Sequence, residues 1–318
     1  MTGEAKKILV SGIKPTGRLH IGNYFGAIKQ YLEMQDSFES YIFIADFHAL
    51  TTLQDPRQLA QNTLDIALDY IALGLDPKSV TIFKQSDVPQ VAELAWIFNC
   101  ITTLPYLERA HAFKDAKAKG QEINVGTFDY PMLMAADIVI YGANTVPVGQ
   151  DQKQHIEFTR DTVEKFNRIF GETFTMPEGL ILKEVETIAG TDGRKMSKSY
   201  GNTISLFASD EEIEKAVMGI VTDSGKDIPE NVYAIHKLFR PEAELKEIYE
   251  TNKGQYKILK EKLIEDVKSF IAPLREKREK LAGDTGAVKE ILKAGGKRAR
   301  EIAESKMEEV RTKVGLKI

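Results

Sequence analysis

The feature that most constrains the fold is an alternation of short apolar segments with longer amphipathic ones in the N-terminal part of the chain. Short apolar runs predict β-strands at Lys7–Ile13, Tyr41–Ala45, Thr81–Lys84 and Thr145–Val148. Helical spacing of apolar residues predicts helices at Gly22–Glu33, Pro56–Leu73, Val88–Thr102, Tyr106–Lys119 and Asp151–Phe170. Strands that alternate with helices indicate a parallel sheet covered by helices on both faces.

The pattern changes after Tyr200, because the C-terminal part contains helical patterns and almost no strand patterns. Helices are predicted at Glu211–Met218, Ala243–Glu250, Tyr256–Lys277 and Ala287–Val314. We therefore expect an α/β domain over residues 1–205, followed by an all-helical domain over residues 206–318.

The C-terminal part is also more basic than the rest of the chain, although the whole protein has a net charge of −4. From Thr251 to the end there are 18 Lys and Arg residues against 11 Asp and Glu residues. A basic segment on an acidic body is compatible with a polyanionic partner. A solvated helical face explains the same pattern, because Lys and Glu interleave along the predicted helices.

Composition excludes several classes of protein. The single cysteine, Cys100, rules out an intrachain disulfide and a cysteine-cluster zinc site, and its apolar surroundings predict that it is buried. No apolar stretch reaches the ~18 residues that a membrane-spanning helix needs. A strand pattern begins close to the N-terminus, so we expect no signal peptide and a cytoplasmic protein.

The first motif is His20-Ile21-Gly22-Asn23, which opens a helix after the first strand and a Pro-Thr-Gly turn. A helix N-terminus presents unpaired N–H groups and a positive dipole end to a phosphate. Gly22 allows a ligand to approach the backbone, and His20 and Asn23 can donate hydrogen bonds. Four residues alone are equally consistent with a turn histidine at an ordinary helix start.

The second motif is Lys195-Met196-Ser197-Lys198-Ser199, preceded by the glycine-rich Gly190–Gly193. Two lysines three residues apart in a mobile loop could bind the pyrophosphate that leaves a nucleotide, with Gly190, Gly193 and Gly201 as hinges. The alternative is a solvated basic loop, but a chance occurrence of this pentapeptide is improbable.

A third motif, Tyr130–Tyr141, contains one carboxylate, Asp137, in an otherwise apolar helical stretch. A buried carboxylate needs a hydrogen-bond donor, from the protein or from a ligand. Tyr130, Met134 and Asp137 share one helical face, which would suit a flat ring that carries an N–H group. Spacing alone favours the alternative, a core helix with a salt-bridged or capped aspartate.

The first two motifs together resemble the HIGH and KMSKS signatures of class I aminoacyl-tRNA synthetases. Asn23 replaces the final histidine of HIGH, as in the tryptophanyl and tyrosyl branch. The segment Ser11–Gly17 and the Asp137 helix resemble the bacterial tryptophanyl members, although Lys14 and His20 differ from the residues that many of them carry. The resemblance implies a Rossmann-like catalytic domain and a helical domain that binds the tRNA anticodon.

The resemblance also implies roles for individual residues. His20, Asn23, Lys195 and Lys198 would be catalytic. ATP would be bound by Lys14, Pro15, Thr16, Gly22, Asn23, Gly149, Gln150, Asp151, Ile188, Lys195, Met196, Ser197, Lys198 and Ser199. Tryptophan would be bound by His48, Tyr130, Met134, Asp137, Val148 and Gln152, whereas His111 and His155 are interpreted as structural.

The implied activity is activation of tryptophan by ATP, with release of pyrophosphate, followed by transfer of the amino acid to its tRNA. Mg²⁺ would accompany ATP as part of the substrate, with no permanently bound cofactor and no protein metal site. The resemblance further implies a homodimer formed through the catalytic domain. Three alternatives remain open: a tyrosyl enzyme of the same branch, a small-molecule nucleotidyltransferase, and a tRNA-binding paralogue without catalysis.

Overall fold

A five-stranded parallel sheet forms the centre of the N-terminal half. The computed structural model describes residues 6–118, 120, 122–148, 153–181, 188–222 and 226–317. The strands are β1 (Ile8–Ile13), β2 (Glu39–Ile44), β3 (Val80–Lys84), β4 (Thr145–Val148) and β5 (Glu178–Ile181), in the order β3-β2-β1-β4-β5. The four predicted strands are confirmed. The edge strand β5 was not predicted, because only its last two residues are large and apolar.

The strand order places a crevice next to the end of β1. Strand β1 pairs with β2 on one side and with β4 on the other, and every pairing is parallel. The connections therefore reverse direction between β1 and β4. In such sheets, ligands bind at this reversal, outside the carboxyl ends of the strands.

Helices cover both faces of the sheet, as predicted. In chain order they are α1 (Ile21–Asn23), the π-helix η1 (Tyr24–Ile28), α2 (Lys29–Met34), α3 (Asp46–Ala49), α4 (Pro56–Leu73), the 3₁₀ turn η2 (Gln85–Asp87), α5 (Gln90–Ile101), α6 (Leu104–Leu107), α7 (His111–Ala118), α8 (Val125–Val139) and α9 (Lys153–Phe170). Alternate strand residues point to opposite faces. Tyr41 and Phe43 belong to the core under α5, α8 and α9, whereas Ile42 and Ile44 belong to the core under α4.

The single helix predicted over Tyr106–Lys119 is wrong, because the structure divides this segment into α6 and α7. The side chain of Gln154, on α9, contacts the backbone at the break. Its Oε1 accepts the N–H of His111 at 2.8 Å, and its Nε2 donates to the carbonyl of Arg109 at 3.3 Å. These tertiary hydrogen bonds satisfy backbone groups that a continuous helix would pair internally.

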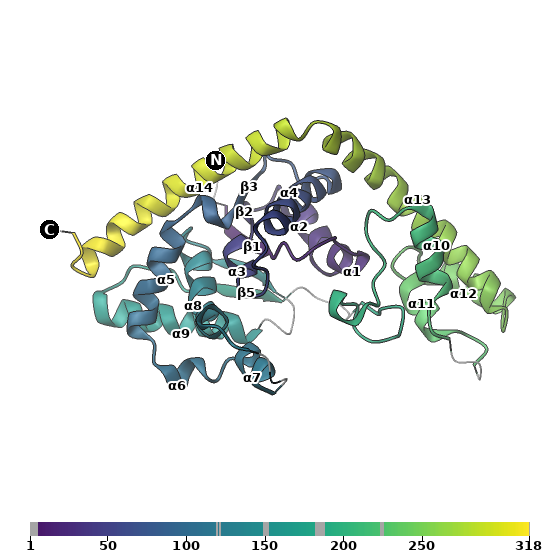
Figure 1. Cartoon of the computed structure of the whole chain (residues 1–318), viewed down its shortest axis with the longest axis horizontal. Helices are drawn as coiled ribbons and strands as arrows, with labels where there is room; N and C mark the ends of the chain where they lie inside the picture. Colours follow the sequence, from purple (N-terminus) through teal and green to yellow (C-terminus); the bar gives the residue numbers. More distant parts are fainter. Residues whose placement is uncertain are drawn as a thin grey trace.

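The C-terminal half is helical. Its elements are the 3₁₀ turn η4 (Lys198–Tyr200), α10 (Asp210–Met218), α11 (Glu230–His236), α12 (Glu242–Thr251), α13 (Tyr256–Gly283) and α14 (Thr285–Lys313). Helix α13 packs against α10, α11 and α4. Figure 1 shows α13 and α14 as one long arc that spans both halves of the molecule.

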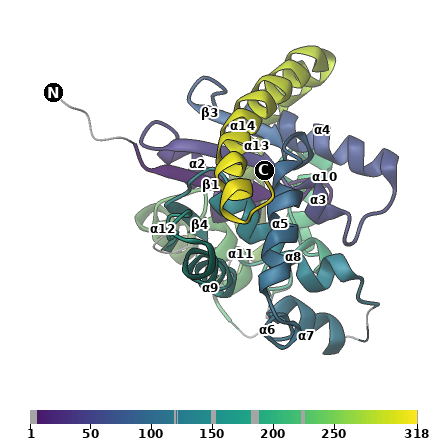
Figure 2. The ribbon, with the colours of Figure 1, turned by 90° about the vertical axis from the view of Figure 1, so that its left-hand side faces the viewer.

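Helix α14 returns from the helical half to the edge of the sheet, where it lies along β3, α4 and α5 (Figure 2). Two glycines allow this close approach. A Cβ atom on Gly295 would lie 2.0 Å from the carbonyl oxygen of Ile82, and one on Gly296 would lie 2.8 Å from the Asp87 Cβ. The domain boundary at residue 205 remains a prediction, and α14 shows that the segment beyond it also completes the α/β core.

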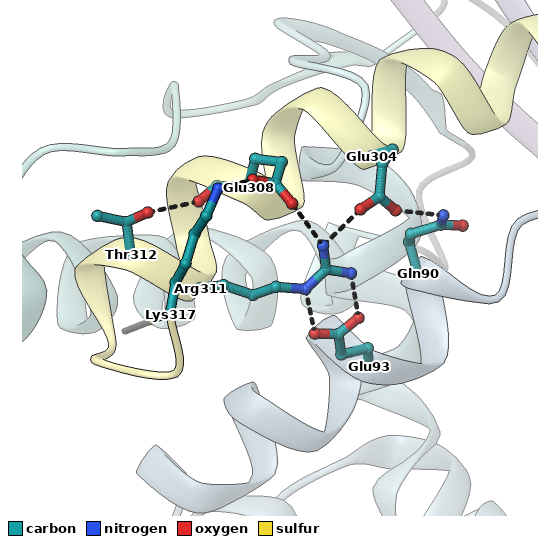
Figure 3. A network of polar contacts seen from close by, with 7 residues as sticks. All are labelled: Gln90, Glu93, Glu304, Glu308, Arg311, Thr312 and Lys317. Carbon is teal, nitrogen blue, oxygen red and sulfur yellow. Dashed lines mark hydrogen bonds and ion pairs between the residues drawn. The ribbon is translucent and has the colours of Figure 1, made fainter.

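The end of α14 is fastened to α5 by Arg311 (Figure 3). Its guanidinium donates to both carboxylate oxygens of Glu93 on α5 at 2.7 Å, and it also contacts Glu304 and Glu308 on α14. Gln90 donates to the second oxygen of Glu304 at 2.6 Å. A planar guanidinium that is paired in this bidentate way orients α14 as well as attracting it.

The prediction that Cys100 is buried is wrong, because the residue is exposed. Trp96 lies one helical turn earlier on α5 and is 70% exposed. The two residues therefore share the face of α5 that points away from the sheet, while Val91, Leu94 and Phe98 supply the buried face. Among the described residues, no helix is long and apolar enough to span a membrane.

Candidate active site

A cavity of about 390 Å³ opens at the crevice beside the ends of β1 and β4. Its lining includes residues of β1, β2, β4 and α8, and it is largely apolar. Five residues that the sequence analysis assigned to the site lie in its wall: Lys14, His48, Tyr130, Met134 and Asp137. The shared helical face predicted for Tyr130, Met134 and Asp137 is therefore the face that α8 presents to this cavity.

Asp137 is 2% exposed and is held by two protein side chains. Its Oδ2 accepts hydrogen bonds from His48 Nε2 at 2.9 Å and from Gln85 Nε2 at 2.8 Å, and its Oδ1 lies 2.9 Å from the same Gln85 nitrogen. Burial raises the pKa of the Asp137 carboxyl, and the hydrogen bonds from His48 and Gln85 act in the opposite direction. The predicted need for donors is confirmed.

Gln85 is a site residue that the sequence analysis missed. It directly follows β3 and is 1% exposed. The only signal in the sequence was its position, since polar residues that follow a buried parallel strand lie at the ligand-binding edge of the sheet.

Tyr130 lies in the cavity wall between two cationic or titratable neighbours. Its hydroxyl is within hydrogen-bond distance of the imidazole of His155, which is 7% exposed. The Lys14 ammonium lies 5.7 Å from the centre of the Tyr130 ring. Burial raises the pKa of the Tyr130 hydroxyl, so this group is a neutral donor at physiological pH. His155, interpreted from the sequence as structural, therefore contacts a residue of the cavity wall.

Lys14 stands at the open side of the cavity. Its side chain is accessible from the cavity, and the protein around it nevertheless lowers its pKa. No ion pair joins Lys14 to any described residue. The neighbouring turn is ordered by two contacts: the Thr16 N–H donates to the Lys14 carbonyl at 2.9 Å, and the Asn62 side chain donates to the Pro15 carbonyl at 3.0 Å.

The two signature motifs meet in space at Gly22. A Cβ atom there would lie 2.9 Å from His20 Nδ1 and 3.2 Å from Met196 Sδ, so only glycine fits without displacing a neighbour. A backbone bridge between His20 and Ser205 joins the same two segments. Residues far apart in the sequence therefore form one continuous wall.

His20 is 7% exposed, and its Nδ1 has no hydrogen-bond partner among the described residues. Burial, helped by the nearby Lys198 ammonium, lowers the His20 pKa to about 4, so the imidazole is neutral at physiological pH. Asn23 Oδ1 accepts the backbone N–H of His20 at 3.0 Å. The Asn23 amide is thus oriented with its NH₂ group turned away from this contact.

The lysine loop is folded around Asn202, a second residue that the sequence analysis missed. Asn202 is 2% exposed; its Oδ1 accepts the N–H of Ser197 at 2.8 Å, and its Nδ2 donates to Asp192 at 2.6 Å and to the Lys195 carbonyl at 3.1 Å. Gly190 leaves the space for this side chain, because a Cβ there would lie 2.2 Å from Asn202 Nδ2.

The loop leaves both of its lysines exposed to solvent. Lys195 and Ser199 are exposed, whereas Met196 is 4% exposed and anchors the loop in the core. The Lys198 ammonium donates to the Gly17 carbonyl at 2.8 Å. Ile188 accepts the Met196 N–H at 2.8 Å and lies beside the loop.

Part of the predicted site lies outside the described residues. Gly149, Gln150, Asp151 and Gln152 belong to this group, as does the side chain of Val148. Their predicted contacts with ATP and tryptophan remain predictions. His111 begins α7 and is exposed, and it takes no part in the described cavity.

Comparison with known proteins agrees with this geometry. The family model described as tRNA synthetases class I (W and Y) matches residues 2–282. The tryptophan–tRNA ligase of Fusobacterium nucleatum is 47% identical over 96% of this chain and 97% of its own length. That of Rhodopirellula baltica is 46% identical over 97% of this chain and 99% of its own length.

A solved structure has the same architecture. The tryptophanyl-tRNA synthetase of Campylobacter jejuni, complexed with ADP and tryptophan, superposes with a TM-score of 0.90 at 43% sequence identity. The alignment covers 97% of this chain and 99% of that one. The expected Rossmann-like fold is confirmed, and the chain belongs to the class I tRNA synthetases for tryptophan and tyrosine.

Proposed function

We propose that this protein is a tryptophan–tRNA ligase, which activates L-tryptophan with ATP and transfers it to the 3′ end of its tRNA. The observation that carries the proposal is a single buried carboxylate, Asp137, in the wall of an apolar cavity next to Tyr130 and Met134. An indole ring fits an apolar cavity, and its N–H group needs one acceptor. The near full-length relatives named above are tryptophan–tRNA ligases.

The same carboxylate supplies a reason to reject phenylalanine. That ring has no N–H group, and its binding would displace water from Asp137 without replacing the lost hydrogen bonds. A site built around a hydrogen bond can reject an analogue that lacks it by ~10⁴-fold. Tyrosine would present an O–H group in a different place, which makes it the sharpest competitor to test.

In the first reaction, an oxygen of the tryptophan carboxylate attacks the α-phosphorus of ATP. A new P–O bond forms, the bond to the β-phosphate oxygen breaks, and pyrophosphate leaves with its electrons. Positioning and charge stabilisation suffice for such a step. Lys14 lines the cavity and is exposed, so it would stabilise both reacting anions. Lys195 and Lys198 would stabilise the negative charge that develops on the leaving pyrophosphate.

His20 and the start of α1 would hold the phosphates. A neutral imidazole with an unpartnered Nδ1 can donate or accept one hydrogen bond, depending on its tautomer. The segments around Gly22 and Asn202 would supply the remaining ATP contacts. The residues expected to make them are Pro15, Thr16, Gly22, Asn23, Ile188, Met196, Ser197 and Ser199. Mg²⁺ would enter as the ATP complex, bound mainly by the substrate phosphates.

The second reaction needs tRNA, and a basic groove offers one surface for its phosphates. The groove, of about 910 Å³, lies between α4 and α14 and is lined by Arg57, Lys84, Lys289, Lys293, Lys297 and Arg300, against two acidic residues, Asp87 and Glu290. Arg298, on the same helix α14, instead donates to Thr81 at 3.3 Å. Phosphate contacts of this kind weaken steeply as salt rises.

A homodimer would explain the large apolar side chains exposed on the catalytic half. Trp96 is 70% exposed, Leu104 68% and Val125 76%, and they lie on α5, α6 and α8, of which α5 and α6 both pack against α8. Exposed apolar surface of this kind marks interaction sites. Size-exclusion chromatography with light scattering, on the wild type and on Trp96→Glu, tests this assembly. The cytoplasm remains the predicted location.

The first experiment is ATP–pyrophosphate exchange with each of the twenty amino acids, without tRNA. Exchange with tryptophan alone supports the activation chemistry and the Asp137 pocket. Exchange with tyrosine would keep the chemistry and overturn the assigned amino acid. Exchange with none, together with retained tRNA binding, would favour the paralogue without catalysis.

A further inference from the structure

Gln85 is buried behind the tryptophan cavity and does not line it. It connects three elements that the chain brings together only in the folded state: η2, where it begins the turn after β3, α3, which carries His48, and α8, which carries Asp137. Its side-chain amide uses both of its ends. Nε2 donates to Asp137, at 2.9 Å from Oδ1 and 2.8 Å from Oδ2, and Oε1 accepts the backbone N–H of His48 at 3.3 Å.

These partners determine which way the amide faces. The backbone N–H of His48 can only donate, so it requires the oxygen of Gln85. An ionised carboxylate can only accept, so Asp137 requires the nitrogen. A flipped amide would place an oxygen against the carboxylate and a nitrogen against an N–H group, and both contacts would be repulsive.

The two oxygens of Asp137 are used unequally. Oδ2 accepts from both His48 and Gln85, whereas Oδ1 accepts only from Gln85 among the described residues. Each carboxylate oxygen has two lone pairs. With respect to the described residues, Oδ1 therefore keeps a free lone pair, and the bonds to Oδ2 hold the plane of the carboxylate that directs this lone pair.

We infer that Gln85 is a positioning residue for amino-acid selection: it orients Asp137 so that Oδ1 accepts the indole N–H of tryptophan. The inference rests on the proposed function. The inference assigns part of the discrimination between amino acids to a residue that does not touch the substrate. It also explains why Gln85 is buried between α8, which lines the pocket, and the end of β3.

The test compares tryptophan with 3-benzothienylalanine, in which sulfur replaces the indole N–H. Gln85→Met keeps the length of the side chain and removes the donor. Because a hydrogen bond to a charged group is worth ~1.5–3 kcal/mol, kcat/KM for tryptophan in ATP–pyrophosphate exchange should fall roughly 10- to 100-fold. The kcat/KM value for the analogue should fall less than about threefold, because the analogue has no N–H group to donate to Oδ1 of Asp137.

Gln90→Met is a matched control. Gln90 is also a partly buried glutamine whose amide donates to a carboxylate, that of Glu304, but it lies between α5 and α14 (Figure 3). This variant should leave the preference for tryptophan over the analogue unchanged. An equal fall for both substrates in Gln85→Met would show a merely structural role, and unchanged kinetics would remove Gln85 from selection; either outcome overturns the inference.

A second variant guards against misfolding of the first. Gln85→Glu is nearly isosteric and places a carboxylate against Asp137, which repels it when both are ionised. Once protonated, the introduced carboxyl group could donate through its hydroxyl as the amide does, so the preference for tryptophan should recover as the pH falls. The other titratable groups that interact with Asp137 are His48, Asp46 and Tyr141, and they are the same in wild type and variant.

No recovery of the preference at low pH would contradict the donor role. The outcomes also separate the inference from the proposed function. Failure of the wild type to exchange with tryptophan defeats the proposed function, whereas normal wild-type exchange with a uniform loss in the variants defeats only the inference.

Discussion

The proposed amino-acid pocket and the lysine loop are two walls of the candidate site, and they are built differently. The pocket carboxylate and its two partners, His48 and Gln85, are each at least nine-tenths buried and come from elements packed on the sheet. The loop buries Met196 and Asn202 but leaves Lys195 exposed. The pocket is thus preformed, which suits the selection of an amino acid. The loop presents an exposed lysine, which suits the stabilisation of negative charge that develops only during the reaction.

The largest expected effect tests the loop. Lys195→Ala should lower kcat for tryptophan activation by ~10²-fold or more with little change in the tryptophan KM, because the contact strengthens in the transition state. Steady-state ATP–pyrophosphate exchange measures both constants. Lys215→Ala, on the exposed side of α10, is a control for loss of a surface charge. A change confined to the tryptophan KM would contradict the role of Lys195 at the leaving group. It would also contradict the proposed difference in function between the pocket and the loop.

The second prediction tests the pocket. Asp137→Asn replaces an acceptor with an amide that can turn either its oxygen or its NH₂ toward the ligand. The preference for tryptophan over phenylalanine and tyrosine should fall roughly 10- to 100-fold, since the lost bond involves a charge. The ratio of kcat/KM values in exchange assays gives this preference. If selectivity is unchanged, Asp137 does not belong to the pocket.

The third prediction concerns the anchor of the loop. Asn202→Ala removes the acceptor of the Ser197 N–H and the donor to Asp192, and the loop should lose its fixed shape. We expect kcat to fall about tenfold, because small displacements of catalytic groups are costly, while the tryptophan KM stays close to the wild-type value. A rise in that KM comparable to the fall in kcat would mean that the loop and pocket are not separate walls.

The last prediction concerns stability rather than catalysis, and it tests the contact between the two motifs. His20 has a pKa of about 4 in the folded protein and about 6.5 when unfolded, so the unfolded state binds more protons between these values. The contribution of His20 to the free energy of unfolding should therefore be fully present above about pH 6.5. The free energy of unfolding should fall by up to ~3 kcal/mol as the pH drops toward 4.

Urea denaturation of wild type and His20→Gln across this pH range measures the effect. The variant should lack this part of the pH dependence. The same slope in both proteins would show that His20 is not desolvated at the Gly22 contact. Between pH 6 and 8, the pH dependence of exchange activity should be the same in wild type and His20→Gln, because His20 stays neutral over this range.

Much of the site followed from local sequence. Patterns of apolar residues predicted four of the five sheet strands, and the Tyr130, Met134 and Asp137 spacing predicted a shared face that the structure confirms. These features depend on the period of a helix or strand, which neighbouring residues determine. The break between α6 and α7 was not predictable in this way, because Gln154 acts on it from α9.

The partners of the key groups required the tertiary structure. Gln85 is one of many glutamines in the sequence, and only the meeting of β3, α3 and α8 places it on Asp137. Asn202 becomes the anchor of the lysine loop through contacts with Asp192, Lys195 and Ser197. A hydrogen bond depends on distance and direction between groups, and the sequence does not display these.

The chain by itself determined a parallel α/β sheet, a helical C-terminal part and one helical face that carries Tyr130, Met134 and Asp137, because periodicity and residue type are local properties. The folded protein decided which oxygen of Asp137 stays available, that Gly22 joins the two motifs, and that α14 closes the edge of the sheet. Packing and hydrogen-bond geometry arise only when distant segments meet, and these features belong to that level.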